Sequence, residues 1–247
     1  MPTRLTRLLS LLVPPVVPLA YREIKSRFAA RLPTAHLSDL FPGIELTQAT
    51  IPAGEFARDR GFLPLQELLT LAAICSYVRP RRVFEIGTYR GSTSLVMAMH
   101  TDTDAEIFTL DLPPQHQATK YSIDNGDITG KAFVVGERYR ETPFASKIQQ
   151  LYGDSARFDF EPYRGVMDLV FVDGNHMYEN VRVDSDSAFN ILRPGGVIVW
   201  DDYSSQSGPG VVRALQEFAG RGLRAIAATR FAIHVSRPPP HRTGVRS

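Results

Sequence analysis

The sequence has little of several features that mark particular protein classes. Its 247 residues include one cysteine, Cys75, so neither an internal disulfide nor a cysteine-based zinc site can form. Cys75 is expected to be a small buried apolar residue, and its isolation favours the reducing environment of the cytoplasm. Opposite charges nearly cancel, with 28 Lys plus Arg against 26 Asp plus Glu, which argues against nucleic acid as a partner.

Long apolar runs are also missing, since no stretch reaches the roughly 20 residues that a membrane-spanning helix needs. The longest candidate, residues 8–20, resembles a secretory signal, but three prolines interrupt it and its cleavage site is poor. Residues 1–60 are predicted to form an N-terminal arm and helical cap. Packing on the domain or on a second subunit of a homo-oligomer is favoured over peripheral membrane contact through residues 4–20. The Pro-rich residues 237–247 are predicted to be a disordered tail.

Between these ends, short apolar runs alternate with segments of helical periodicity, which is the pattern of an α/β sheet flanked by helices. Residues 61–236 are therefore predicted to form one domain, with a C-terminal antiparallel hairpin at one edge of the sheet. Residues 115–146 are polar and lie where such a sheet presents loops above its ligand crevice, so a helix and a lid are expected there. Strands are predicted at 82–86, 107–112, 147–152, 167–172, 197–200, 223–228 and 231–236, and helices at 64–78, after Gly91, at 178–192 and at 211–219.

The turn after the first of these strands carries an acid, Glu85, and two glycines four residues apart. Gly87 permits a sharp backbone reversal, and Gly91 lets a ligand or strand approach the start of the following helix. The spacing differs from the G-x-G-x-x-G dinucleotide fingerprint, which weakens the alternative of a nucleotide-dependent oxidoreductase. Glu85 would repel a pyrophosphate, but it can accept hydrogen bonds from an ammonium group or from the amides of the loop.

Two further acids follow the next two strands. Asp111 ends the second strand, where a carboxylate can accept both hydroxyls of a ribose. Asp154 ends the third strand, in position to contact an adenine amino group. Either acid alone could cap a turn, but together with the glycine loop they indicate a nucleoside-containing ligand.

Residues 83–93, Val-Phe-Glu-Ile-Gly-Thr-Tyr-Arg-Gly-Ser-Thr, resemble the first motif of the class I S-adenosylmethionine-dependent methyltransferases, and more narrowly the metal-dependent O-methyltransferases. The similarity extends from about Leu65 to Trp200 and its following acids. It implies a Rossmann-like, seven-stranded, mostly parallel sheet with a reversed final hairpin. It also implies a methionine site on the glycine loop, a ribose site at the second strand and an adenine site at the third. The implied cofactor-binding residues are Glu85, Gly87, Thr88, Tyr89, Gly91, Ser92, Thr93, Asp111, Asp154, Ser155 and Asp173.

Three carboxylates follow the fourth and fifth strands: Asp173 after one, and Asp201 with Asp202 after the other. Neighbouring parallel strands bring their carboxyl ends together above one crevice. Such carboxylates would repel one another unless a cation neutralises them, and their hard oxygen ligands suit Mg²⁺ or Mn²⁺. In the alternative, Asp201 or Asp202 caps the following helix or pairs with a basic residue such as Arg213.

His176 lies three residues beyond Asp173, within reach of a substrate hydroxyl, and its ordinary pKa near 6.5 suits a general base. The segment resembles the fourth motif of bacterial small-molecule O-methyltransferases, where Asp-x-x-His implies a metal ligand and a base. The Asp201-Asp202 pair departs from the Asp-Asn of the catechol-type enzymes. That departure favours a hydroxylated sugar or polyketide acceptor.

The predicted function is methyl transfer from S-adenosylmethionine to a hydroxyl of a small molecule, a sugar, polyketide or phenolic. His176 and Asp173 are the predicted catalytic residues, and Tyr178 and Tyr203 are candidates for shaping the acceptor pocket. A non-catalytic S-adenosylmethionine-binding protein stays an alternative. A nucleic-acid methyltransferase is disfavoured because no basic stripe interleaved with aromatics is present.

Overall fold

The computed structural model describes residues 31–52, 63–114, 119–123 and 133–237. The chain divides into two units, Met1–Arg31 and Leu32–Ser247, and the account below concerns the second. Most of the predicted N-terminal arm, including residues 4–20, and nearly all of the predicted tail lie outside the described residues.

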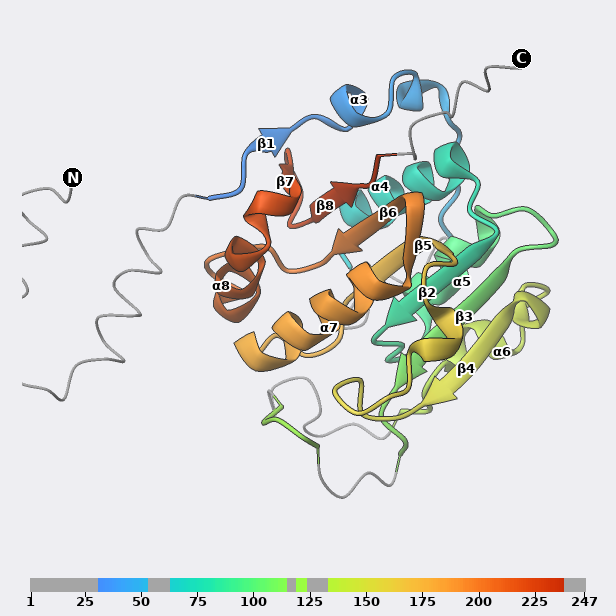
Figure 1. Cartoon of the computed structure of the whole chain (residues 1–247). Coiled ribbons are helices and arrows are strands. Elements are labelled where there is room, and N and C mark those ends of the chain that lie inside the picture. Colours follow the sequence, from blue (N-terminus) through green and yellow to red (C-terminus); the bar gives the residue numbers. More distant parts are fainter. Residues whose placement is uncertain (1–30, 53–62, 115–118, 124–132, 238–247) are drawn as a thin grey trace, which may run out of the picture. The chain divides into compact units, whose positions relative to one another are not determined.

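Eight strands form one sheet in the order β1-β7-β8-β6-β5-β2-β3-β4 (Figure 1). β8 runs antiparallel to its neighbours β6 and β7, and the other adjacent pairs are parallel. The expected α/β class, with its mostly parallel sheet and C-terminal antiparallel strands, is confirmed. The strands are β1 (Thr34–Ala35), β2 (Arg82–Ile86), β3 (Glu106–Asp111), β4 (Ile148–Tyr152), β5 (Met167–Val172), β6 (Leu192–Trp200), β7 (Arg224–Ile226) and β8 (Ala232–Val235).

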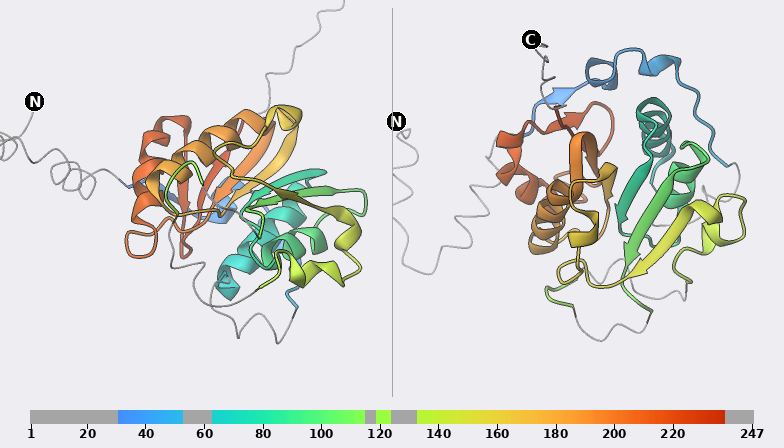
Figure 2. Two further views of the ribbon diagram at one scale, coloured as in Figure 1. Left: turned by 90° about the horizontal axis from the view of Figure 1, so that it is seen from below. Right: turned by 45° about the vertical axis from the view of Figure 1, so that its right-hand side comes forward.

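Helices cover both faces of this sheet (Figure 2). Residues of α4 and α5 pack in one hydrophobic core, and residues of α7 and α8 pack in the other. β5 serves both cores by alternation, since Leu169 and Phe171 belong to the first while Val170 and Val172 belong to the second. The α-helices are α3 (Leu37–Leu40), α4 (Leu65–Val78), α5 (Ser92–Met99), α6 (Glu137–Arg140), α7 (Tyr178–Ile191) and α8 (Pro209–Glu217). The 3-10 helices are η1 (Ile44–Leu46), η2 (Ala145–Lys147), η3 (Glu161–Tyr163) and η4 (Ala219–Arg221).

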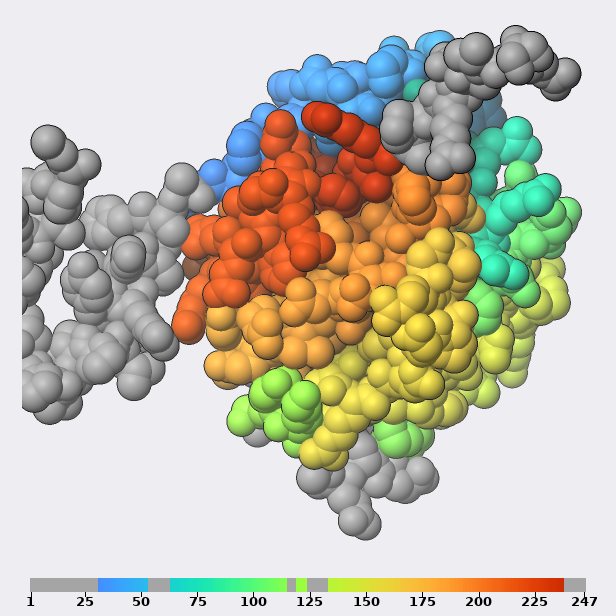
Figure 3. Space-filling model, in the orientation of Figure 1, coloured from blue at the N-terminus to red at the C-terminus, as the bar shows by residue number. Residues whose placement is uncertain are grey.

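The sheet has one strand more than the expected seven. Thr34 and Ala35 form β1, which pairs in parallel with β7, so the predicted hairpin of β7 and β8 is not at the edge of the sheet. Leu32 and Phe41, on either side of β1, are buried in the two cores. Figure 3 shows this N-terminal stretch in blue beside the red C-terminal strands. Within the described part of the chain, no helix is long and apolar enough to cross a membrane.

Candidate active site

Backbone hydrogen bonds join the five predicted site loops along the carboxyl edge of the sheet. The amide of Gly153 donates to Asp111, and the amide of Gly87 donates to Leu110, each across 2.8 to 2.9 Å. On the other side of β2, the Asp173 amide donates to Ile86 at 2.8 Å, and the Asp201 amide donates to Val172 at 3.1 Å. The loops after β2, β3, β4, β5 and β6 therefore lie side by side, as parallel strands require.

The carboxylate of Asp111 holds the glycine loop. Its Oδ2 accepts a hydrogen bond from the amide of Tyr89 at 2.6 Å, and its Oδ1 accepts one from the amide of Leu112 at 2.7 Å. Tyr89 has a φ of +47°, in the left-handed region that few non-glycine residues adopt. Such a conformation persists only where the surrounding structure fixes it, which is frequent at ligand sites. Asp111 thus lies directly beside the glycine loop.

Gly87 is required by the close approach of the loops after β2 and β5. Its φ is +102°, and a Cβ placed on it would lie 2.0 Å from the carbonyl oxygen of Asp173. No side chain fits between these two backbones. Gly87, the first residue of the glycine loop, therefore lies against Asp173, the first residue of the loop after β5, which is called the acidic loop below.

Glu85 points into the protein beneath the glycine loop and is fully buried. Its Oε2 accepts hydrogen bonds from the hydroxyls of Ser94 and Thr109. Among the described residues, no hydrogen-bond partner reaches its Oε1. Burial raises the pKa of Glu85 to about 8. Of the two acids, Asp111 rather than Glu85 accepts a hydrogen bond from an amide of the loop.

The residues predicted at the adenine side have well-defined partners. The carboxylate of Asp154 accepts the amides of Ala156 at 3.0 Å and of Lys120 at 2.7 Å, so it caps its own turn and also holds the segment 119–123. The hydroxyl of Ser155 lies near the carboxyl of Asp184 on α7 and opposes the rise in the pKa of that carboxyl. Asp184 is itself buried, and burial raises its pKa to about 7. The sequence analysis did not single out Asp184.

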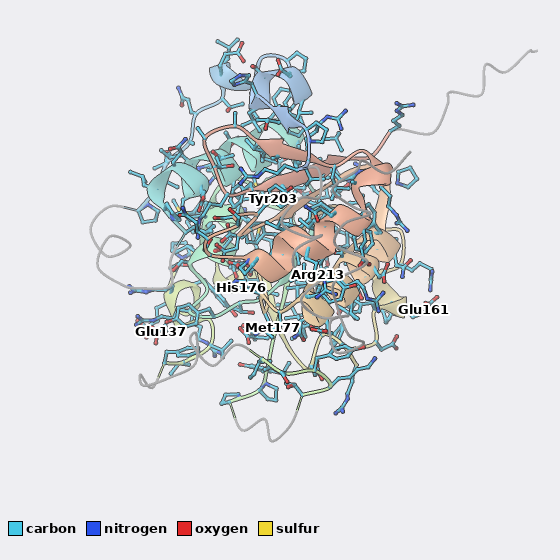
Figure 4. All side chains as sticks on the ribbon, turned by 90° about the vertical axis from the view of Figure 1, so that its left-hand side faces the viewer. Glu137, Glu161, His176, Met177, Tyr203 and Arg213 are labelled. Atoms are coloured by element: carbon cyan, nitrogen blue, oxygen red, sulfur yellow. The ribbon has the colours of Figure 1, made fainter. Side chains whose placement is uncertain are left out.

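His176 and two of the three predicted acids form a compact cluster. The Nε2 of His176 lies 3.0 Å from Oδ2 of Asp202 and 3.8 Å from Oδ1 of Asp173. Figure 4 labels His176 and also Tyr203 and Arg213. One donor atom from each of these three residues lies within 4.8 Å of the other two. The two carboxylates raise the pKa of His176 to about 11, so its imidazole is a cation near neutral pH in the metal-free protein.

Asp201 lies behind this cluster and is not among the three residues whose donor atoms come together. It is 6% exposed, and within the described structure no hydrogen-bond partner reaches its Oδ1. Burial raises the pKa of Asp201 to about 9. Together with Asp173, Val181 and Val211, Asp201 lines a small cavity between the acidic loop and the helices α7 and α8.

Arg230, in the turn between β7 and β8, supplies a fixed positive charge to the acidic cluster. Its guanidinium pairs with Asp202 and lies 3.8 Å from Asp201. The buried Glu67 of α4 pairs with the same guanidinium at 3.0 Å and also accepts the Arg230 backbone amide at 2.9 Å. Asp202 is therefore paired with a basic residue, as the alternative reading of these acids expected, but the partner is Arg230 rather than Arg213.

Arg213 instead stacks on Tyr178, with its guanidinium carbon 3.9 Å from the ring centroid. The Tyr178 hydroxyl donates to Glu217 on α8. Tyr203 accepts the amide of Leu32 on its hydroxyl oxygen at 2.8 Å. Both tyrosines, predicted to shape the acceptor pocket, thus also hold structural contacts.

Three of these polar side chains, Glu67, Asp184 and Arg230, lacked a signal in the sequence. Glu67 is 163 residues from its partner Arg230, and Asp184 lies near Ser155 although it belongs to another element. None of the three lies in a motif, because each is brought to the site by the packing of a helix or turn distant in the chain.

A family model described as a methyltransferase domain matches residues 84–203. A search of curated proteins finds no match. Among solved structures, the O-methyltransferase TomG from Streptomyces achromogenes, in complex with SAM, is 20% identical with a TM-score of 0.53, covering 71% of this chain and 82% of that one. Cofactor-bound Rv0187 from MTB is 19% identical with a TM-score of 0.54, covering 97% and 100%.

An O-methyltransferase from Bacillus cereus, in complex with SAH, is 14% identical with a TM-score of 0.51, covering 90% of this chain and 94% of that one. At these identities the likeness is one of fold. The matched residues 84–203 begin in β2 and end just after the acids that follow β6, so they span all the loops of the carboxyl edge described above.

Proposed function

We propose that the protein transfers a methyl group from S-adenosylmethionine to a hydroxyl of a small molecule, since a methyltransferase-domain model matches residues 84–203 and the fold is that of solved O-methyltransferases. The observation that carries the proposal is the meeting of two loops at Gly87. There the glycine loop, held by Asp111, lies against the loop that bears Asp173 and His176. The residues proposed for the cofactor site and the proposed proton acceptor thus adjoin at one edge of the sheet.

The cofactor would bind along the loops after β2, β3 and β4. Asp111 is placed to accept the ribose hydroxyls, and the glycine loop to contact the methionine portion, with Asp154 and Ser155 on the adenine side. S-adenosylmethionine supplies a methyl group that its sulfonium sulfur already activates. The work left to the protein is to align the acceptor oxygen, remove its proton and exclude water.

His176 is the proposed general base. Its Nε2 faces Asp202 and Asp173, and these carboxylates fix the ring and favour its protonated form after it has taken a proton from the acceptor hydroxyl. The same carboxylates hold the imidazole protonated in the metal-free protein, since the pKa of His176 is about 11 there. A base must start neutral, so the negative charge around His176 has to be compensated before it can act.

The charge of the cluster fits a divalent cation. Asp173, Asp201 and Asp202, with Glu67, face one permanent cation, Arg230. Asp201 ionises with difficulty because it is buried beside other acids. We assign Mg²⁺ or Mn²⁺ to the carboxylates of Asp173 and Asp202, which each offer an oxygen within 4.8 Å of the other, and Asp201 lies outside this group. When bound, the cation would lower the pKa of His176 and of a nearby hydroxyl.

The acceptor class follows from the same charge. Two consecutive acids at the end of β6 favour a polyhydroxylated neutral molecule, a sugar or polyketide, over a phenolic one. Carboxylates that are not occupied by a cation accept hydrogen bonds from such hydroxyls.

Calorimetric titration with S-adenosylhomocysteine tests the cofactor assignment. The wild type is expected to bind it, and Asp111→Ala to bind it at least about tenfold more weakly, since a charged hydrogen-bond acceptor is lost. Asp104→Ala, at the exposed opposite end of β3, is the matched control and is expected to bind like the wild type. If the folded wild type does not bind S-adenosylhomocysteine, the proposed function is wrong.

Titration with Mn²⁺, followed by its electron paramagnetic resonance signal, tests the metal. Asp202→Asn removes one of the proposed ligands and is expected to weaken Mn²⁺ binding by at least about tenfold. Asp102→Asn, a surface acid paired with Arg79, serves as the control. Equal Mn²⁺ affinity in all three proteins would show that the carboxylates are structural.

A further inference from the structure

A short segment that belongs to none of the sequence motifs described above lies directly against the glycine loop. The amide of Gly136 donates to the carbonyl of Tyr89, and the amide of Arg138 donates to that of Arg90, each at 2.9 Å. Between them, Glu137 forms an ion pair with Arg90. The residues around α6 thus hydrogen-bond to the two central residues of the loop. The segment was expected to form part of a lid over the ligand crevice.

Tyr139 of this segment fills the space between two glycines. A Cβ placed on Gly91 would lie 2.5 Å from its ring, and one placed on Gly136 would lie 2.5 Å from its hydroxyl oxygen. Both glycines have positive φ, +84° and +73°. Only 4% of Tyr139 is exposed, so the ring is enclosed between the start of α5 and the start of α6.

The hydroxyl of Tyr139 begins a chain of buried hydrogen bonds. It donates to Oε1 of Gln150 on β4 at 2.8 Å, and Nε2 of Gln150 donates to Oγ1 of Thr88 at 3.0 Å. Thr88 shares a hydrogen bond of 2.6 Å with Thr109, which donates in turn to Glu85. Burial raises the pKa of Tyr139 to about 12, so the hydroxyl remains a donor at working pH. The chain links the outer segment, through the loop, to the buried acid beneath it.

We propose that Tyr139 is a positioning residue of the cofactor site, one that holds the glycine loop in its binding conformation. The inference rests on the proposed function. Tyr89 keeps its unfavourable φ because Gly136 holds its carbonyl on one side and Asp111 holds its amide on the other. Tyr139 fixes the segment that carries Gly136, and its hydroxyl fixes Thr88, the residue before Tyr89. A loop ordered in advance binds its ligand without the cost of ordering it.

Removing only the hydroxyl tests this role while the ring still fills its space. Tyr139→Phe is expected to bind S-adenosylhomocysteine about fivefold more weakly by calorimetry, the effect of one neutral hydrogen bond. The KM for S-adenosylmethionine should rise by the same factor, with the KM for the acceptor unchanged. Tyr163→Phe is the matched control, because it removes a hydroxyl from a tyrosine that packs on Phe84 and Phe108 and is not part of the chain of hydrogen bonds.

Gln150→Leu breaks the same chain at its next member and is expected to weaken binding by a similar factor. The double variant with Tyr139→Phe should add little, since both changes remove one link. If both single variants bind S-adenosylhomocysteine like the wild type, even with a lowered melting temperature, Tyr139 has a structural role alone and the inference is wrong. If the wild type itself does not bind S-adenosylhomocysteine, the proposed function is wrong, and the inference that rests on it is wrong as well.

Discussion

Replacing His176 by alanine is expected to lower kcat by about 10²- to 10⁴-fold and to leave the affinity for S-adenosylhomocysteine unchanged. The reason is its position. Its Nε2 lies 3.0 Å from Asp202 on the acidic side of the site, while the residues expected to contact the cofactor, apart from Asp173, lie on the loops after β2, β3 and β4. Loss of this imidazole removes the proton acceptor without disturbing Asp111 or the glycine loop.

Two measurements separate a base from a metal ligand at this position. A base that does not ligate the metal leaves Mn²⁺ affinity unchanged in His176→Ala, whereas a ligand weakens it by about tenfold or more. His100→Ala, at the end of α5 where its ring accepts the amide of Thr50, controls for the loss of a histidine elsewhere. A kcat within about threefold of the wild type would remove His176 from the mechanism.

Replacing Gly87 by alanine is expected to lower the free energy of unfolding by about 3 kcal/mol or more and to abolish S-adenosylhomocysteine binding. The added methyl carbon would lie 2.0 Å from the Asp173 carbonyl oxygen and 2.9 Å from the Gly174 amide nitrogen. These are backbone atoms, and the Asp173 amide is tied to Ile86 at 2.8 Å. Relief therefore requires the glycine loop and the acidic loop to move apart.

Gly43→Ala is the matched control, because Gly43 has a similar φ of +87° and nothing within 4 Å of the added carbon. It carries the conformational penalty without the collision, and a loss of about 1 to 2 kcal/mol is expected from chemical denaturation. The difference between the two variants measures the contact between the loops. Equal stabilities would mean that the loops after β2 and β5 do not meet.

Much of the fold could be predicted because its signals are local. The runs that became β2 and β5 are apolar and end in residues that stop strands, and the helical face of residues 64–78 became α4. Asp111, Asp173 and Asp202 could be placed at one edge because the carboxyl ends of parallel strands share an edge. The resemblance of the motif around Gly87 to a methyltransferase motif predicted which residues would bind the cofactor.

The partners of these residues could not be predicted in the same way. β1 has two residues, too few for any periodic pattern, and it exists only because β7 offers an unpaired edge. Arg230 comes to Asp202 across 28 residues and to Glu67 across 163. Nothing in the sequence distinguishes it from Arg213, which was the example of a basic partner in the alternative prediction for Asp201 or Asp202.

Local patterns in the sequence predict which residue types lie at which strand ends, since alternation, apolar runs and turn residues act over a few neighbours. Which of these residues contact one another depends on the packing of the folded chain. This packing placed His176 with Asp173 and Asp202 while leaving Asp201 behind them, and it brought Tyr139 to the glycine loop. Contacts between distant elements are set by how whole faces pack, and a packed face depends on every side chain that fills it.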